Sequence, residues 1–160
     1  MIRPFVDTDL DALYRIQILC PQAAQWRRED YLQLARDPGG VFLVAEVEDG
    51  DRPGLAGFTA FHHVADEAEL RNIAIDPRHQ RKGVARALLA AGIGTLQKLG
   101  TRRLFLEVRR SNLPALAFYE TAGFQVIYTR RNYYHDPEED ALVMAKSVAP
   151  PQDVHLPPTD

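Results

Sequence analysis

Residues 72–89 read NIAIDPRHQRKGVARALL, an apolar run followed by a basic loop and then by the start of an amphipathic segment. The apolar run predicts a strand. From Arg81 onward the apolar residues recur with a helical period and share one face, which comprises Ala85, Leu88, Leu89, Gly92, Leu96 and Leu99. Gly100 is placed to end this helix as its C′ residue. A strand that leads into a helix and then into the apolar run 103–109 predicts a β-α-β crossover.

The rest of the chain predicts further strands and helices around this unit. Apolar and alternating runs predict strands at 2–6, 41–50, 54–64, 103–109, 124–130 and 140–148, with residues 69–75 as the strand that enters the basic loop. Helical spacing predicts helices at 7–19, capped by Asp7 or Thr8, at 27–36, and from the cap Asn112 or Ser111 through Tyr119. The fold class is therefore α+β (mixed α/β), with one central, mostly antiparallel sheet of about seven strands and four helices.

Composition limits the function classes. The chain has 160 residues and a net charge of -3, which fits one domain and lacks the basic field needed for non-specific nucleic-acid binding. The single cysteine and the scattered histidines predict neither a disulfide nor a metal site. The chain has no leader-like or membrane-spanning stretch, so a cytoplasmic protein is expected. Residues 1–148 form the predicted domain, and the proline-rich residues 149–160 form a tail expected to be disordered.

The basic loop is a candidate anion site. A helix N-terminus offers unpaired N–H groups, and Gly83 lets a ligand approach the backbone closely. Arg81, Lys82 and Arg86 place positive charge there, although cations at a helix N-terminus oppose the helix dipole by about 0.3–1 kcal/mol each. By charge alone, a solvated basic first turn explains the pattern equally well. The dipole argument favours a bound anion.

The segment NIAIDPRHQRKGVARALL resembles the acyl-CoA-binding segment of the GNAT superfamily of N-acetyltransferases, which has an apolar strand, a Q/R-rich glycine loop and a helix. The resemblance implies a GNAT fold and implies that the anion is the pyrophosphate of coenzyme A. It assigns that group to the loop and first helical turn, and the pantetheine arm to backbone N–H groups of the preceding strand. The implied cofactor-binding residues are Arg81, Lys82, Gly83, Val84, Ala85 and Arg86 in the loop and helix, and Ile73, Ala74 and Ile75 in the strand. Ala85 stands where many relatives have a second glycine.

A second resemblance runs from about Asp66 to Ala145, roughly half the chain. LFLEVRRSNLPALAFYETAGF, followed by RRNYYHDPEEDALVMA, is similar to the RimI-type ribosomal-protein alanine N-acetyltransferases. That resemblance implies acetyl transfer from acetyl-CoA to a protein N-terminal α-amine, by direct attack in a ternary complex. It makes Glu107 the general base and Tyr119 the proton donor, adds Asn112 to the cofactor contacts, and sets Tyr133 and Tyr134 near the acceptor peptide.

The residues themselves leave alternatives open. Partial burial of Glu107 in an apolar strand would raise its pKa and suit a base, whereas a surface glutamate would pair with Arg109 or Arg103. Tyr119 is a suitable acid for a thiolate, or an aromatic packed in the core beside Phe118. Asn112 caps a helix in either case. Tyr133 and Tyr134 are alternatively two ordinary exposed or core aromatic residues.

The acceptor is also open at this level. An α-amine has a pKa near 8 and lysine one near 10.4, so deprotonating lysine costs about 3 kcal/mol more, and a single glutamate matches an N-terminal amine better. The alternatives are a GNAT enzyme acting on a small-molecule amine or on lysine, and a non-catalytic acyl-CoA sensor, which an ion-paired Glu107 turned into solvent would favour. A nucleotide-binding or RNA-binding module is disfavoured by the acidic net charge. The sequence does not determine the oligomeric state.

Overall fold

Seven strands and four α-helices follow one another in the predicted order within residues 1–150, the part of the chain that the computed structural model describes. The strands are β1 (Ile2–Pro4), β2 (Gly40–Asp49), β3 (Arg52–Val64), β4 (Glu67–Ile75), β5 (Arg103–Arg109), β6 (Gln125–Tyr134) and β7 (Glu139–Ser147). The helices are α1 (Leu10–Leu19), α2 (Arg28–Arg36), α3 (Val84–Lys98) and α4 (Leu113–Thr121), with 3-10 turns η1 (Asp7–Asp9) and η2 (Pro77–His79). The predicted mixed class, with about seven strands and four helices, is confirmed.

All strands belong to one sheet, in the order β1-β2-β3-β4-β5-β7-β6. Every neighbouring pair is antiparallel except β4 and β5, which run parallel because α3 carries the chain from the end of one to the start of the other. The predicted antiparallel meander followed by a β-α-β crossover therefore describes the topology correctly.

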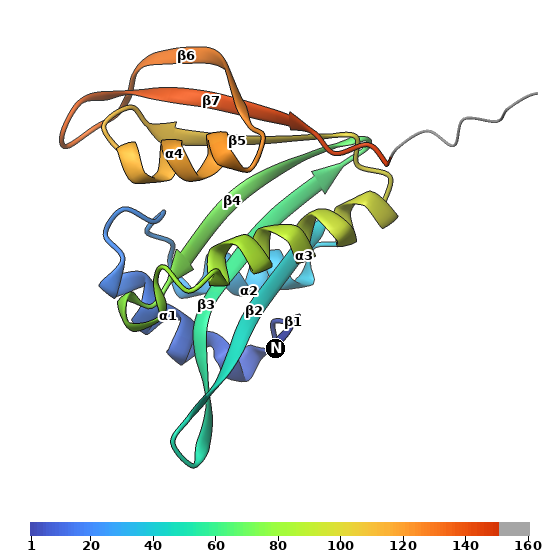
Figure 1. Cartoon of the computed structure of the whole chain (residues 1–160), viewed down its shortest axis with the longest axis vertical. Helices are drawn as coiled ribbons and strands as arrows, with labels where there is room; N and C mark the ends of the chain where they lie inside the picture. The colour runs from blue at the N-terminus through green and yellow to red at the C-terminus, as the bar shows by residue number, and fades with distance from the viewer. Residues whose placement is uncertain (151–160) are drawn as a thin grey trace, which may run out of the picture.

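Helices cover both faces of the sheet (Figure 1). Helices α3 and α4 pack on one face, over a core that includes Leu88, Leu96, Leu104 and Met144. Helices α1 and α2 pack on the other face of β2–β4, over a core rich in aromatic residues around Tyr31 and other buried side chains: Phe5, Phe42 and Phe58. On that second face, β5–β7 carry no helix within residues 1–150.

The sheet opens between β4 and β5. The two strands pair only where Glu67–Glu69 face Arg103–Phe105, and within the described residues no later pairing joins them. Beyond this short ladder the strands diverge (Figure 1). The C-terminal half of β4 therefore has a backbone edge that β5 does not occupy, at the centre of the sheet.

A β-bulge changes the direction of the side chains along β4. Ala60 pairs with Asn72 while Phe61 pairs with Leu70, so Arg71 is the extra residue. Before the bulge Leu70 packs toward α3, and after it Ile73 and Ile75 do, which shifts the alternation by one residue. The bulge leaves Arg71 beside Glu69 on the open face, and it turns Asn72 into a buried polar contact with Tyr31.

Helix α3 begins later than predicted. Arg81 has a left-handed φ of 61° and belongs to the loop, and the first helical residue is Val84. The end is as expected, with Gly100 left-handed just after the helix, but Leu99 is largely exposed and does not belong to the buried face.

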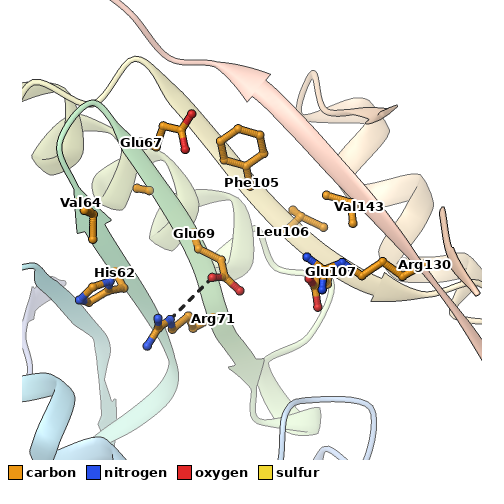
Figure 2. Close-up of a pocket in the computed structure, with 11 residues that line it drawn as sticks. His62, Val64, Glu67, Glu69, Arg71, Phe105, Leu106, Glu107, Arg130 and Val143 are labelled. Atoms are coloured by element: carbon orange, nitrogen blue, oxygen red, sulfur yellow. Dashed lines mark ion pairs between the residues drawn. The ribbon is translucent and has the colours of Figure 1, made fainter. Parts of the chain in front are cut away.

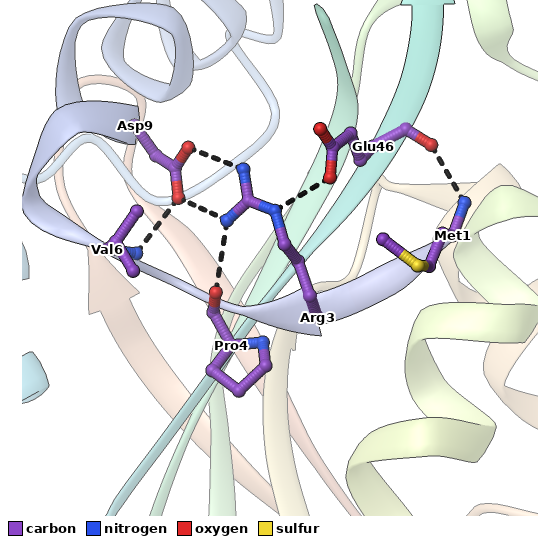
Figure 3. Close-up of polar contacts among 6 residues, drawn as sticks. All are labelled: Met1, Arg3, Pro4, Val6, Asp9 and Glu46. Atoms are coloured by element: carbon purple, nitrogen blue, oxygen red, sulfur yellow. Dashed lines mark hydrogen bonds and ion pairs between the residues drawn. The ribbon is translucent and has the colours of Figure 1, made fainter. Parts of the chain in front are cut away.

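The predicted cap of the first helix is also wrong. Neither Asp7 nor Thr8 caps α1, since both lie inside the 3-10 turn η1. The carboxylate of Asp9 instead accepts hydrogen bonds from Val6 N at 2.9 Å and from both terminal nitrogens of Arg3 at 2.8 Å (Figure 3). Arg3 also donates from Nε to Glu46 of β2 at 2.8 Å. The N-terminal segment is thus held to the sheet by one arginine and two carboxylates.

None of the helices within residues 1–150 is long and apolar enough to cross a membrane. Strand β7 ends at Ser147, next to the predicted domain end at residue 148. Most of the predicted tail, residues 151–160, lies outside the described residues.

Candidate active site

The N-terminus of α3 is an open hydrogen-bonding end. Ala87 N donates to Gly83 O at 3.0 Å, so the N–H groups of Val84, Ala85 and Arg86 precede the first turn of helical bonding. Gly83 has a φ of 83°, and a Cβ built on it would meet no atom within 4 Å. The helix end is therefore open to an approaching ligand.

Three cations surround this end. Arg81, Lys82 and Arg86 are exposed, and none of them forms an ion pair with any other residue in the described part of the chain. The nearest acid in the loop, Asp76, is bound by the guanidinium of Arg78 at 3.0 Å. Together with the helix N-terminus, the three cations form a site for a strongly charged anion.

The free edge of β4 runs from this anion site to the opening in the sheet. Asp76 N donates to Ala56 O of β3 at 2.7 Å, so backbone alternation turns Ala74 toward β3 and turns Ile73 and Ile75 toward the opening. The carbonyl of Ile75 already accepts hydrogen bonds from Cys20 Sγ at 3.1 Å and Gln80 Nε2 at 3.0 Å. The N–H groups of Ile73 and Ile75 are placed to bind an extended ligand, and Ala74 is not.

Glu107 lies on the helix-free side of β5, in a pocket of about 370 Å³ (Figure 2). Its Oε1 is 3.3 Å from Nε of Arg130, which reaches in from β6, and its side chain is 21% exposed. The two arginines predicted as partners are engaged elsewhere: Arg109 binds Glu139 at 3.3 Å, and Arg103 stacks on Phe105 at 4.9 Å. Glu107 is thus both ion-paired and directed into a pocket.

One of the two predicted acceptor residues, Tyr133, borders this carboxylate. The rings of Tyr133 and Tyr134 meet edge to face, with centroids 5.1 Å apart. Tyr133 faces the Glu107 carboxylate, and this contact raises the pKa of the Tyr133 phenol. Tyr134 packs under the guanidinium of Arg109, which lies 4.2 Å from the ring centroid. The structure therefore brings Glu107 and Tyr133 together, as predicted for one site.

Tyr119 lies on the opposite side of β5. It is buried in the core beneath α4, against Phe118 and Phe124. Burial raises the pKa of its phenol and makes it a weaker acid than an exposed tyrosine. Glu107 and Tyr119 therefore lie on opposite faces of the sheet.

Asn112 caps α4, as the sequence predicted. Its Oδ1 accepts a hydrogen bond from Ala115 N at 3.3 Å, and Pro114 follows within the first turn. Among residues 1–150 the side-chain amide nitrogen has no hydrogen-bond partner, so it can bind a ligand near the start of the helix.

The structure adds residues that the sequence analysis did not assign. Glu69 and Arg71 line the pocket of Glu107, 3.8 Å apart, and Arg71 also lines a second pocket of about 330 Å³ beside Trp26 and α2. The alternation of charged and apolar residues over 67–71 was a signal for them, because it assigns Glu67, Glu69 and Arg71 to one face. Arg130 is the first residue of the motif RRNYYHDPEEDALVMA, but its separation from Glu107 in the sequence does not indicate that the two side chains form an ion pair.

The arrangement suits acyl transfer. It combines an anion site, a strand edge that can bind an extended arm, a carboxylate on one side of the opening and a phenol on the other. Residues 1–150 contain no cluster of three or more His, Cys, Asp or Glu side chains that could hold a metal ion.

Comparisons with known proteins agree with this geometry. Residues 10–124 match the acetyltransferase (GNAT) family. The [ribosomal protein bS18]-alanine N-acetyltransferase of Escherichia coli K12 is 40% identical over 144 residues, which cover 89% of this chain and 93% of the relative. The crystal structure of the Escherichia coli ribosomal-protein-S18-alanine N-acetyltransferase superposes with a TM-score of 0.80 at 35% identity, covering 98% of each chain. Ard1 from Thermoplasma volcanium superposes with a TM-score of 0.84 at 28% identity, covering 94% of this chain and 98% of its own. The chain therefore belongs to the acetyltransferase (GNAT) family.

Proposed function

We propose that the protein acetylates the α-amino group of a protein N-terminus with acetyl-CoA as donor, and that its acceptor is a ribosomal protein beginning with alanine. The identity to the bS18-alanine N-acetyltransferase, which extends over 89% of the chain, supports this acceptor. The observation that carries the proposal is the position of Glu107, which lies in a pocket beside the opening while the free end of α3 lies at the far end of the β4 edge.

The described residues fit acetyl-CoA as donor. Acetyl-CoA supplies an acetyl group activated as a thioester. The first-turn N–H groups of Val84, Ala85 and Arg86, with the side chains of Arg81 and Lys82, bind the pyrophosphate. The N–H groups of Ile73 and Ile75 bind the pantetheine arm, and Asn112 binds the cofactor near the start of α4. Gly83 allows close approach because no atom lies near its missing Cβ.

The neutral amine is the nucleophile, so an acceptor that arrives as an ammonium group first loses one proton to solvent. Glu107 and Tyr119 handle the two proton transfers that follow. Glu107 accepts the proton that leaves the attacking nitrogen, directly or through a water molecule, and Tyr119 delivers a proton to the departing sulfur. The new C–N bond and the broken C–S bond both lie at the opening, which the two side chains border from opposite faces. Tyr133 and Tyr134 orient the first residues of the acceptor.

One alternative has an observation in its favour. A non-catalytic acyl-CoA sensor is consistent with the ion pair between Glu107 and Arg130. The other feature expected for a sensor, a Glu107 turned into solvent, is absent from the described structure, because this side chain is only 21% exposed and lines the pocket. The enzyme proposal accounts for both observations.

A peptide panel tests the acceptor. The protein is incubated with acetyl-CoA and peptides that begin with Ala, Ser, Met or Gly, and free thiol release is followed. Turnover should be fastest with alanine. Binding of coenzyme A without thiol release from any peptide would contradict N-terminal acetylation and support the sensor.

Two variants test the catalytic assignment. Glu107→Gln and Tyr119→Phe should each lower kcat by about 10²–10⁴-fold, because each removes one proton-transfer group, while the affinity for acetyl-CoA stays unchanged. Glu120→Gln and Tyr128→Phe, made at exposed positions, are the matched controls and should keep full activity. Full activity in the first pair would remove these roles and leave the fold assignment intact.

A further inference from the structure

The only cation paired with Glu107 in the described structure comes from β6. Nε of Arg130 lies 3.3 Å from Oε1 of Glu107 (Figure 2). The guanidinium also lies 5.3 Å from the ring centroid of Tyr133. Arg130 is thus held between the carboxylate and the aromatic residue that borders it. In this position its guanidinium occupies space next to Oε1 of the proposed general base.

The other arginine side chains near the pocket form contacts with residues other than Glu107. Arg71 lies 3.8 Å from Glu69 on β4, and Arg109 binds Glu139 and stacks on Tyr134. The Arg130 side chain is 50% exposed, whereas the Glu107 side chain is 21% exposed. A long, half-exposed side chain on the edge strand can leave its partner for solvent at low cost, because exposed ion pairs contribute little.

A guanidinium cannot accept a proton or become neutral near pH 7. While Arg130 lies beside Oε1, its positive charge opposes the approach of a second cation to that oxygen. An N-terminal amine is mostly protonated at neutral pH, since its pKa is near 8, so it arrives as a cation. The arriving ammonium group and the resident guanidinium therefore compete for the same carboxylate.

We propose that Arg130 is a displaceable counter-ion of Glu107, which the ammonium group of the acceptor replaces before transfer. Arg130 is a positioning residue and not a catalytic one. It pairs with the carboxylate when no acceptor is bound, and it lowers the affinity for every cationic acceptor by the free energy of the ion pair. This inference rests on the proposed N-terminal acetylation and adds a step to it.

Peptide binding measured without turnover tests the proposal. Calorimetric titration of the full chain, saturated with coenzyme A, uses an alanine-initiated tetrapeptide amide with a free amine and the same peptide with an acetylated amine. Arg130→Gln should bind the free-amine peptide about two- to fivefold more tightly than the unsubstituted protein, the range available from a weak ion pair. Its affinity for the acetylated peptide, which carries no ammonium, should not change.

Two further variants make the result specific. Arg131→Gln removes the same charge from the next residue of β6, which has no ion-pair partner among residues 1–150, and should leave both affinities unchanged. Arg130→Lys retains a cation and should bind like the unsubstituted protein. If Arg130 had a purely structural role, Arg130→Gln would instead bind both peptides more weakly and would have a lower thermal midpoint than the unsubstituted protein.

The outcomes separate the two proposals. If the unsubstituted protein acetylates the peptide but Arg130→Gln binds it equally or more weakly, the displacement step is wrong and N-terminal acetylation stands. If the unsubstituted protein binds coenzyme A but neither binds nor acetylates the peptide, N-terminal acetylation is wrong and the displacement step is rejected with it.

Discussion

Gly92 lies on the predicted face of α3, but the helical period explains only part of why a glycine is there. The sequence placed it on the apolar face of α3, and it is indeed buried there. A Cβ at this position would overlap the ring of Phe61 on β3, so the contact between helix and sheet requires the absence of a side chain. The helical period indicated the direction in which Gly92 points, but not the distance to its neighbour on β3.

Replacing Gly92 tests this contact. Gly92→Ala should lower the free energy of unfolding by about 1–3 kcal/mol, because Phe61 must shift in a packed core. The comparison is Gly94→Ala in the same helix, where a Cβ would meet nothing within 4 Å. That variant should raise stability by about 0.5–1 kcal/mol through helix propensity. Denaturant unfolding of both variants measures the difference, and equal stabilities would contradict the close-packing argument.

Individual elements were predicted more accurately in their centres than at their ends. Strand β5 has the predicted bounds, Arg103–Arg109, since its alternation is uninterrupted. The predicted start of α1 was wrong, because Asp7 and Thr8 lie in the 3-10 turn η1 and Asp9, which precedes the helix, binds Arg3 of β1. A side chain that can bind a distant strand cannot be assigned from its neighbours in sequence.

Arg3 joins β1 to η1 and β2 through its contacts with Asp9 and Glu46 (Figure 3). The stability that these contacts contribute depends on pH. Burial alone would raise the pKa of Asp9, but the hydrogen bonds from Arg3 and from Val6 N outweigh it and lower the pKa. A lowered pKa contributes stability above the unfolded-state value, near 4, and this contribution is lost as the pH falls through the folded-state value.

Asp9→Asn measures this contribution. At pH 7 the variant should be less stable by about 1–3 kcal/mol, because it loses charge-assisted hydrogen bonds. The difference from the unsubstituted protein should shrink as the pH falls from about 5 toward 3, as urea unfolding at several pH values would record. Asp11→Asn, at a side chain that is 81% exposed, should change stability by no more than about 0.5 kcal/mol. A pH-independent difference at Asp9 would rule out the linkage.

At the scale of the whole molecule, the opening divides the sheet into two parts. Strands β1–β4 carry α1, α2 and α3, whereas β5–β7 carry α4, and three residue pairs join β4 to β5. In the proposed function, coenzyme A contacts both parts, through the edge of β4 and α3 on one side and through Asn112 of α4 on the other. A ligand that contacts both parts stabilises the whole fold.

Coenzyme A should therefore raise the thermal midpoint. At about 100 times its dissociation constant it adds about 2.7 kcal/mol, or about 5–10 °C for a domain of this size. Arg86→Gln, in the first turn of α3, should reduce this increase, and Lys98→Gln, in the last turn of the same helix, should not. Thermal unfolding with and without coenzyme A measures both. An undiminished increase in Arg86→Gln would exclude that cation from the anion site.

The sequence by itself determined the order of strands and helices, the mixed sheet, the glycine loop before α3, and the strand that carries Glu107. Each of these depends on periodicity or on neighbours within a few residues, which local sequence specifies directly. The resemblance of residues 72–89 to a coenzyme A-binding segment has the same local character. The bulge at Arg71 also left a local trace, the change of phase between Leu70 and Ile73, although only the pairing with β3 identifies the extra residue.

Only the tertiary structure decided where β4 and β5 separate, which faces Glu107 and Tyr119 occupy, and which cation meets Glu107. Arg130 and Glu107 lie 3.3 Å apart but belong to β6 and β5, which are not adjacent in the sheet because β7 lies between them. Such contacts depend on strand order, register and side-chain reach together, and no local pattern encodes their combination. The acceptor side of the site is built from these contacts, whereas the anion site lies largely within one continuous segment that the sequence makes visible.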